Sequence, residues 1–121
     1  MEITLYDDSG KPVAYLDIDD ENTIWMWEGH AVAYIEDNVI FGWNGEHLGW
    51  FIDQIIYDLN GYRVGYTGET CPRNLKLEPF KKFKRFKRFK RFQRHVKSMR
   101  TLKVSTSERN LKEFLESGSV D

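Results

Sequence analysis

The sequence predicts an all-β fold of four repeated β-hairpins with pseudo-fourfold symmetry, followed by an extended basic arm rich in Phe and a short C-terminal α-helix. Two observations lead to this prediction. A twelve-residue pattern occurs four times between residues 5 and 67, and a separate segment carries Phe at every third position between residues 80 and 92. The expected boundaries are 1–70 for the hairpin domain, 71–104 for the arm, and 105–121 for the helix and tail.

The four copies of the pattern are LYDDSGKPVAYL, IWMWEGHAVAYI, IFGWNGEHLGWF and IYDLNGYRVGYT. Each copy has a Gly at its sixth position, a small residue four positions later, and then a large aromatic residue. The glycines are Gly10, Gly29, Gly45 and Gly61, the small residues are Ala14, Ala33, Gly49 and Gly65, and the aromatic residues are Tyr15, Tyr34, Trp50 and Tyr66. Neighbouring strand residues face opposite sides, so the small residue and the aromatic residue lie on different faces. A small residue inside a strand indicates close approach by a ring or another backbone, which suggests convergence around a common axis.

Each copy resembles two short strands around a tight turn, because β-branched and aromatic residues flank a turn dipeptide. Asn44-Gly45 and Asn60-Gly61 favour a type I′ turn, in which both central residues have positive φ. A single hairpin is only marginally stable, so the four are expected to bury their faces against each other. A closed or nearly closed arrangement would also leave no exposed strand edge.

On these segments, the final NGYRVGYT included, the chain resembles the four-fold beta flower domain family. The resemblance is clear over about the first 67 residues, and the Phe-Lys-Arg segment is similar to tails in such proteins. It implies four β-hairpins packed like petals. It implies no catalytic or cofactor-binding residue and no established activity, so the function has to be inferred from the residues.

Charge divides the chain into regions of opposite sign. Residues 1–70 hold fourteen acidic and two basic side chains, residues 71–104 hold one acidic and fourteen basic, and residues 105–121 hold four acidic and two basic. Inside the arm the sequence FKKFKRFKRFKRF has a period of three. A polyproline II chain has three residues per turn, and it would place the five Phe on one side roughly 9 Å apart. The expected interaction residues are Phe80, Phe83, Phe86, Phe89 and Phe92 with Lys84, Arg85, Lys87, Arg88, Lys90 and Arg91.

Several roles are open for this arm. The Phe row could dock in grooves between hairpins while the cations pair with the acidic domain, or the arm could cross to a second copy of the chain and hold a dimer together. Basic residues interleaved with aromatic rings also suit nucleic acid or another polyanion, although the acidic domain would repel such a partner. A membrane-surface role is the remaining possibility, since anionic headgroups attract cations and Phe can insert.

The last segment is expected to form a short amphipathic helix that is stable only when it docks. Ser105 and Glu108 form a possible capping box and Gly118 a possible stop signal. Between them, three apolar residues share one face of a helix at its natural spacing. These residues are Leu111, Phe114 and Leu115.

The sequence offers no group of residues arranged for catalysis, and no cofactor or metal is expected. His30 and His47 follow turn glycines, where exposed residues are normal, and two histidines without a third ligand make a poor metal site. His95 lies among cations in the arm. The segment DIDDEN from Asp17 resembles a calcium loop, but it lacks the Gly and the flanking helices of one, which favours a solvated loop.

The remaining conspicuous residues have ordinary explanations. Cys71 has no neighbouring base that would make it a nucleophile. Trp25, Trp27, Trp43 and Trp50 are expected in the core, with a ligand pocket as the alternative. The sequence has no long apolar run, its start MEITLYDDSG is acidic, and its single Cys allows no internal disulfide, so we expect a cytoplasmic protein. The expected function is that of a non-catalytic scaffold or interaction module that associates with itself or another protein, with the basic arm docked on the acidic β domain. Binding of nucleic acid or another polyanion through the arm is the alternative.

Overall fold

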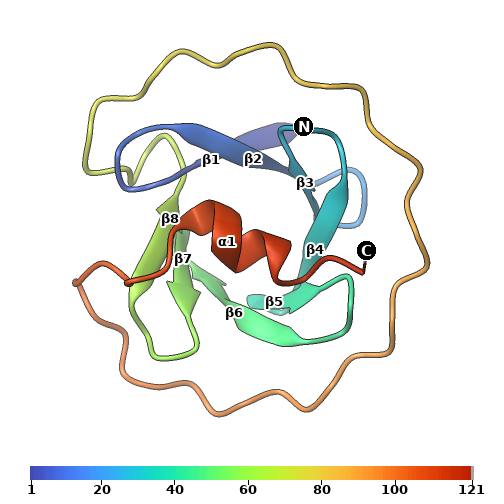
Figure 1. Cartoon of the computed structure of the whole chain (residues 1–121). Helices are drawn as coiled ribbons and strands as arrows, with labels where there is room; N and C mark the ends of the chain where they lie inside the picture. Colours follow the sequence, from blue (N-terminus) through green and yellow to red (C-terminus); the bar gives the residue numbers. More distant parts are fainter. Residues whose placement is uncertain (121) are drawn as a thin grey trace.

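Eight antiparallel strands close into a barrel in which every strand pairs with its neighbours in sequence (Figure 1). The structure is a computed structural model, and it describes residues 1–120. The strands are β1 (Glu2–Tyr6), β2 (Pro12–Asp17), β3 (Thr23–Met26), β4 (Ala31–Glu36), β5 (Val39–Gly42), β6 (His47–Ile52), β7 (Ile55–Asp58) and β8 (Arg63–Tyr66), and the helix α1 is Leu111–Glu116. Pairing of Tyr6 in β1 with Tyr66 in β8 closes the barrel. The prediction of an all-β fold built from four repeated hairpins is confirmed.

The turns inside the hairpins differ from the type I′ turns predicted at Asn44-Gly45 and Asn60-Gly61. Among residues 1–120, the positive-φ set includes the turn glycines but neither Asn44 nor Asn60. In the third hairpin the amide of Gly45 donates to the carbonyl of Gly42, and the amide of Gly42 donates to the carbonyl of Glu46. This is a three-residue loop, a type I turn followed by one left-handed Gly, which is the second common way to join two strands.

Left-handed pairs of residues occur instead in the connections between successive hairpins. The pairs are Glu21–Asn22, Asp37–Asn38 and Asp53–Gln54, with φ between 51° and 66°. Asn and Asp adopt this conformation more readily than most residues. Asp37–Asn38 and Asp53–Gln54 are therefore two-residue turns with the positive φ angles of type I′, and Glu21–Asn22 ends a longer connection between β2 and β3. The Asn-Gly motif misplaced these turns by about half a repeat.

Helix α1 fills one end of the barrel and completes its core, which confirms the prediction that the terminal helix docks (Figure 1). Leu111, Phe114 and Leu115 are fully buried. They pack over the small residues of the repeats: a Cβ atom at Gly49 would lie 2.9 Å from the tip of Phe114, and one at Gly65 would lie 2.8 Å from Leu111. The residues that converge on the barrel axis are therefore those of the helix.

The helix begins later than the predicted capping box. Its N-cap is Asn110, whose side chain accepts a hydrogen bond from the amide of Glu113 and donates one to the carboxylate of Glu113. Ser105 instead accepts a backbone hydrogen bond from Arg63 in β8. The predicted cap at Ser105 is wrong because pairing with the barrel holds that segment extended. The helix ends just before Gly118, as predicted.

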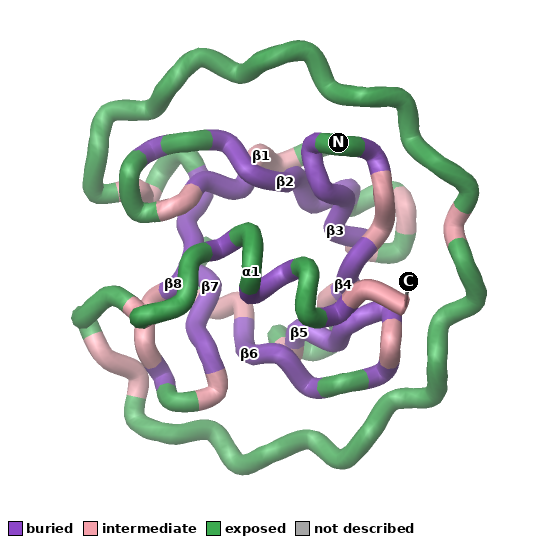
Figure 2. Tube along the Cα trace, viewed as in Figure 1, coloured by how far each residue is buried: buried purple, intermediate pink, exposed green. Residues whose placement is uncertain are grey.

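The large aromatic side chains of the repeats face the outside of the barrel wall, yet they are buried. Tyr15, Trp25 and Trp27 form one such cluster, and Tyr34, Phe41 and Trp43 form another. The arm runs around the barrel over this outer surface, so the strands are largely buried and the arm is largely exposed, while α1 buries only the face that meets the barrel (Figure 2). The prediction that the tryptophans lie in the packed part of the molecule is confirmed for all four.

Candidate functional site

The arm encircles the barrel and is attached to each of the four hairpin turns (Figure 1). Backbone amides nine residues apart donate to the carbonyl oxygens of the four turn glycines. The pairs are Lys76 to Gly10, Arg85 to Gly29, Arg94 to Gly45 and Lys103 to Gly61, at distances between 2.7 and 2.9 Å. An extended chain without internal hydrogen bonds has its amides available for such contacts. The arm thus repeats the fourfold symmetry of the barrel in its own nine-residue period.

Two tryptophans strengthen this attachment at the second and third hairpins. The indole N–H of Trp27 donates to the carbonyl of Pro79, and that of Trp43 donates to the carbonyl of Arg88, again nine residues apart. The backbone carbonyl of Trp27 accepts from the amide of Lys82 in return. A buried indole N–H needs an acceptor, and here the arm supplies it.

Every third residue of the arm places a lysine against the barrel. This inner lysine row consists of Lys81, Lys84, Lys87 and Lys90. Their ammonium groups lie over aromatic rings: that of Lys81 is 4.5 Å from the centre of Tyr15, and that of Lys90 is 4.4 Å from the centre of Tyr34. Lys87 lies between Trp25 and Trp43, at 5.7 and 5.5 Å. Cations at this distance from ring faces are attracted to them, which explains how charged side chains cover an aromatic surface.

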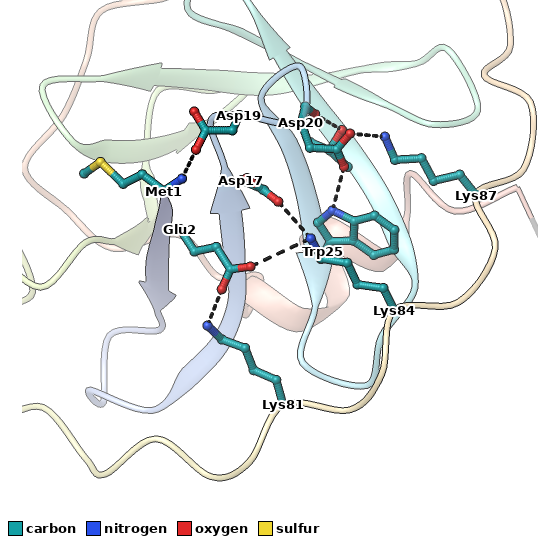
Figure 3. A network of polar contacts seen from close by, with 10 residues as sticks. Met1, Glu2, Asp17, Asp19, Asp20, Trp25, Lys81, Lys84 and Lys87 are labelled. Carbon is teal, nitrogen blue, oxygen red and sulfur yellow. Dashed lines mark hydrogen bonds and ion pairs between the residues drawn. The ribbon is translucent and has the colours of Figure 1, made fainter.

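The same lysines pair with carboxylates of the barrel (Figure 3). The pairs are Lys81–Glu2 at 2.6 Å, Lys84–Asp17 at 2.8 Å and Lys87–Asp20 at 2.6 Å. The hydrogen bond from Lys84 lowers the pKa of Asp17, and the same bond raises the pKa of Lys84. Asp17 is buried and Asp20 also accepts from the indole of Trp25, so the acidic segment predicted to be a solvated loop is an attachment point for the arm.

The phenylalanines directly precede the inner lysines in the three-residue period and face away from the barrel. The Phe row consists of Phe80, Phe83, Phe86, Phe89 and Phe92, and each side chain is between 96 and 99% exposed. The idea that these rings dock in grooves between hairpins is wrong. Because the lysines take the inward position of a chain with threefold periodicity, the Phe are left on the outside.

The third position of the period carries cations that are also exposed. This outer cation row consists of Lys82, Arg85, Arg88, Arg91 and Arg94. Arg94 lies 3.8 Å from the carboxylate of Glu46, at an exposed site where such a pair contributes little. The outside of the arm therefore combines apolar rings with positive charge. The structure divides the eleven residues proposed from the sequence as an interaction arm between two faces. The inner face has Lys84, Lys87 and Lys90, and the outer face has the five Phe with Arg85, Arg88 and Arg91.

His47 differs from the exposed turn residue expected from the sequence. It is buried in β6, with its ring edge-on to Trp50. Its Nδ1 accepts from the backbone amide of Lys97, and its Nε2 donates to the carbonyl of Gly49. Burial lowers the pKa of His47. The neutral ring therefore connects the arm to the barrel wall between two hairpin attachments.

The other candidates for chemistry find no partners that would make a site. Within residues 1–120, no group of three or more His, Cys, Asp or Glu side chains could hold a metal ion. The ring of His30 comes no nearer than 4.0 Å to the carboxylate of Glu116, and His95 is exposed on the arm. The thiol of Cys71 points to the carbonyl of Asp7 at 3.5 Å. In the described part of the chain, no helix has the length and apolar character needed to cross a membrane.

Comparison of the sequence with known proteins identifies the family of the chain. The profile described as 4-fold beta flower protein matches residues 3–115. The chain belongs to this family. The match includes the arm and most of the helix as well as the hairpins, so it extends beyond the first 67 residues on which the resemblance was clear. Neither the curated proteins nor the solved structures include a significant match to this beta flower chain.

Three features of the site were not found by sequence reasoning, and one of them is the attachment of the arm to the four turn glycines at nine-residue intervals. The inward lysines were grouped with the outward arginines, because composition does not separate positions of a three-residue period. The bond from Lys97 to His47 was also missed. One signal could have revealed that the lysines and the arginines face opposite ways. Lys fills all four inner positions 81, 84, 87 and 90, and Arg occurs at none of them.

Proposed function

We propose that this beta flower protein is a non-catalytic interaction module that binds a polyanionic partner through the outside of its arm. The observation that carries the proposal is that one row of cations of the arm contacts the barrel while another row faces solvent. The inner lysine row is engaged with aromatic rings and carboxylates of the barrel. Lys82, Arg85 and Arg91 of the outer cation row are exposed beside the Phe row. A cytoplasmic location, expected from the composition, is part of the same proposal.

The docked arm weakens the main objection to a polyanionic partner, which is the acidic domain behind it. Glu2, Asp17 and Asp20 lie behind the Phe-rich part of the arm and are paired with the inner lysine row. Their charges are therefore compensated locally. The exposed cations in front of them act at shorter range than the remaining carboxylates, and charges further than about 8–10 Å away are largely screened at physiological salt.

The test measures binding of inorganic polyphosphate to the full chain at increasing salt concentration. The logarithm of the binding constant should fall linearly with the logarithm of salt, as counterion release requires. Changing both Arg85→Gln and Arg91→Gln should reduce that slope by about 1.5. Backbone contacts of the two residues do not depend on their side chains, so the arm should stay docked.

The matched control has the same change in net charge away from the arm, namely Lys11→Gln with Lys112→Gln. Both lysines are exposed near the helix end of the barrel. Their replacement should leave the slope unchanged. Absence of binding to polyphosphate at low salt, or an equal loss of slope in the control, would show that the proposal is wrong.

Self-association is the second candidate function, and the apolar area of the Phe row favours it. Five exposed Phe offer roughly 750–1,250 Å² of surface, which is comparable to one side of a stable protein interface. Two copies meeting row to row would also bring their outer cation rows together, and this repulsion is why we place self-association second. Sedimentation equilibrium distinguishes the two: an assembly held by Phe should persist at moderate salt and disappear in the Phe83→Ser, Phe86→Ser, Phe89→Ser variant.

A further inference from the structure

We infer that the polyanion is the surface of an anionic lipid bilayer, into which the middle of the Phe row inserts. This inference rests on the proposed function and names its partner. The first observation is the amount of apolar surface left uncovered. The largest apolar patch on a typical monomer is about 300–600 Å². The five exposed Phe side chains together offer roughly 750–1,250 Å². Each ring is at least 96% exposed, so nothing in the described chain covers it.

The shape of the surface favours a bilayer over a nucleic acid strand. Single-stranded nucleic acid binds in grooves, where the backbone follows a positive channel and bases stack on the walls. Here the arm forms the outer rim of a ring around the barrel, and the Phe row follows this convex rim (Figure 1). A ridge with projecting rings suits insertion into a soft interface, and Phe has no polar group that would need a partner there.

The curvature of the rim decides which rings reach a flat surface together. Four attachments at nine-residue intervals make a circle of about 36 residues, and at about 3.1 Å per residue its radius is about 18 Å. A plane that touches the rim at Phe86 passes about 3 Å from Phe83 and Phe89. It passes about 10 Å from Phe80 and Phe92. Insertion by 5–10 Å is ordinary for interfacial proteins, so the three central rings can insert at once.

The charges on this arc complement anionic headgroups. Lys82, Arg85 and Arg91 are exposed beside the three central rings. Positive side chains close to an anionic membrane each strengthen binding several-fold, and they do so less at higher salt. The carboxylates directly behind this arc, Asp17 and Asp20, are paired with Lys84 and Lys87. An edge-on approach therefore brings the compensated part of the acidic barrel nearest to the lipid.

The experiment compares two vesicle compositions in a co-sedimentation assay with the full chain. One is phosphatidylcholine alone, and the other contains about one third phosphatidylserine. Binding is expected to the second composition and to be much weaker for the first. Phe86→Ser should weaken binding about tenfold, since one ring no longer enters the interface. Phe92→Ser is the matched control, because it removes the same exposed ring outside the contact arc, and its effect should be less than threefold.

Each outcome has a defined meaning. Binding that is equal for both compositions, or unaffected by Phe86→Ser, contradicts the inference. The same samples are tested against polyphosphate and against a single-stranded oligonucleotide. Binding of these two without binding of the anionic vesicles overturns the lipid inference and leaves the proposed function in place, whereas absence of binding to all three overturns both. Both substitutions affect fully exposed side chains, and an unchanged thermal unfolding curve confirms that the fold is intact.

Discussion

The two faces of the arm reverse the usual arrangement of a protein surface. Its inner face presents ammonium groups to buried tyrosines and tryptophans, while its outer face presents aromatic rings to solvent. The inner face is explained by stability, because each lysine gains a ring face and most gain a carboxylate as well. The Phe row on the outer face is covered by no residue of the described chain. A side chain type that is apolar and repeated, yet uncovered by its own molecule, is better explained by what the molecule binds.

The strongest test of this comparison uses one side chain in two environments. Phe114 is fully buried between helix and barrel, and Phe86 is almost fully exposed. Phe114→Ala should lower the free energy of unfolding by about 3–5 kcal/mol, because it leaves a cavity against Gly49 in β6. Phe86→Ala should change it by less than about 0.5 kcal/mol. Urea denaturation of both variants measures the difference, and a loss of stability in Phe86→Ala above about 1 kcal/mol would mean that the Phe row has a structural role.

A smaller effect is expected where the arm meets a hairpin turn. Gly45 has φ of +87°, and a Cβ atom there would collide with the carbonyl oxygen of Phe92. Gly45→Ala should therefore cost about 1–3 kcal/mol and loosen the arm locally. Trypsin should then cleave after Arg91 and Arg94 faster than in the parent protein, because the bond from Arg94 to Gly45 is strained.

The control for this change is Gly68→Ala. A Cβ at that position would lie 3.4 Å from the nearest side-chain atom, which is ordinary contact, and its φ is not in the left-handed region. Its cleavage pattern should match that of the parent chain. Equal protection of the arm in Gly45→Ala would show that the glycine contacts do not hold the arm in place.

The sequence predicted the barrel well, because each repeat contains its own alternation of large, small and turn residues. The helix was also predictable from Leu111, Phe114 and Leu115, whose spacing defines one face. The path of the arm was not. The arm reaches one turn glycine every nine residues, whereas the glycines themselves are 16 or 19 residues apart in the sequence. Only the closed barrel places Gly10, Gly29, Gly45 and Gly61 at regular angles around its axis. The outward direction of the Phe row follows from these contacts and from the lysines, so period three alone could not reveal it.

The smallest expected effect concerns the one buried imidazole that holds the arm. The folded protein keeps His47 neutral, with a pKa below its usual value near 6.5 because of burial, and its Nδ1 accepts from the amide of Lys97. The rings of Phe41 and Trp50 flank His47 and exclude water from it. The carbonyl of Gly49 accepts its one hydrogen bond, and the positive charge of Lys97 opposes protonation of the ring.

As the pH falls below about 6.5, the unfolded chain binds a proton at this residue more readily than the folded chain, so the free energy of unfolding should decrease. Its contribution to stability is present above that pH and is lost as the pH falls towards the lowered pKa of the folded state. Urea denaturation from about pH 7.5 to 5 measures the slope, which should flatten in His47→Gln and persist in His95→Asn, since His95 is exposed on the same arm. Asp17, the other group with a lowered pKa, titrates near pH 4 in the unfolded chain and does not contribute in this window. An unchanged slope in His47→Gln would mean that the link between His47 and Lys97 is not what couples the arm to pH, and that the inner lysine row and the glycine contacts hold the arm without it.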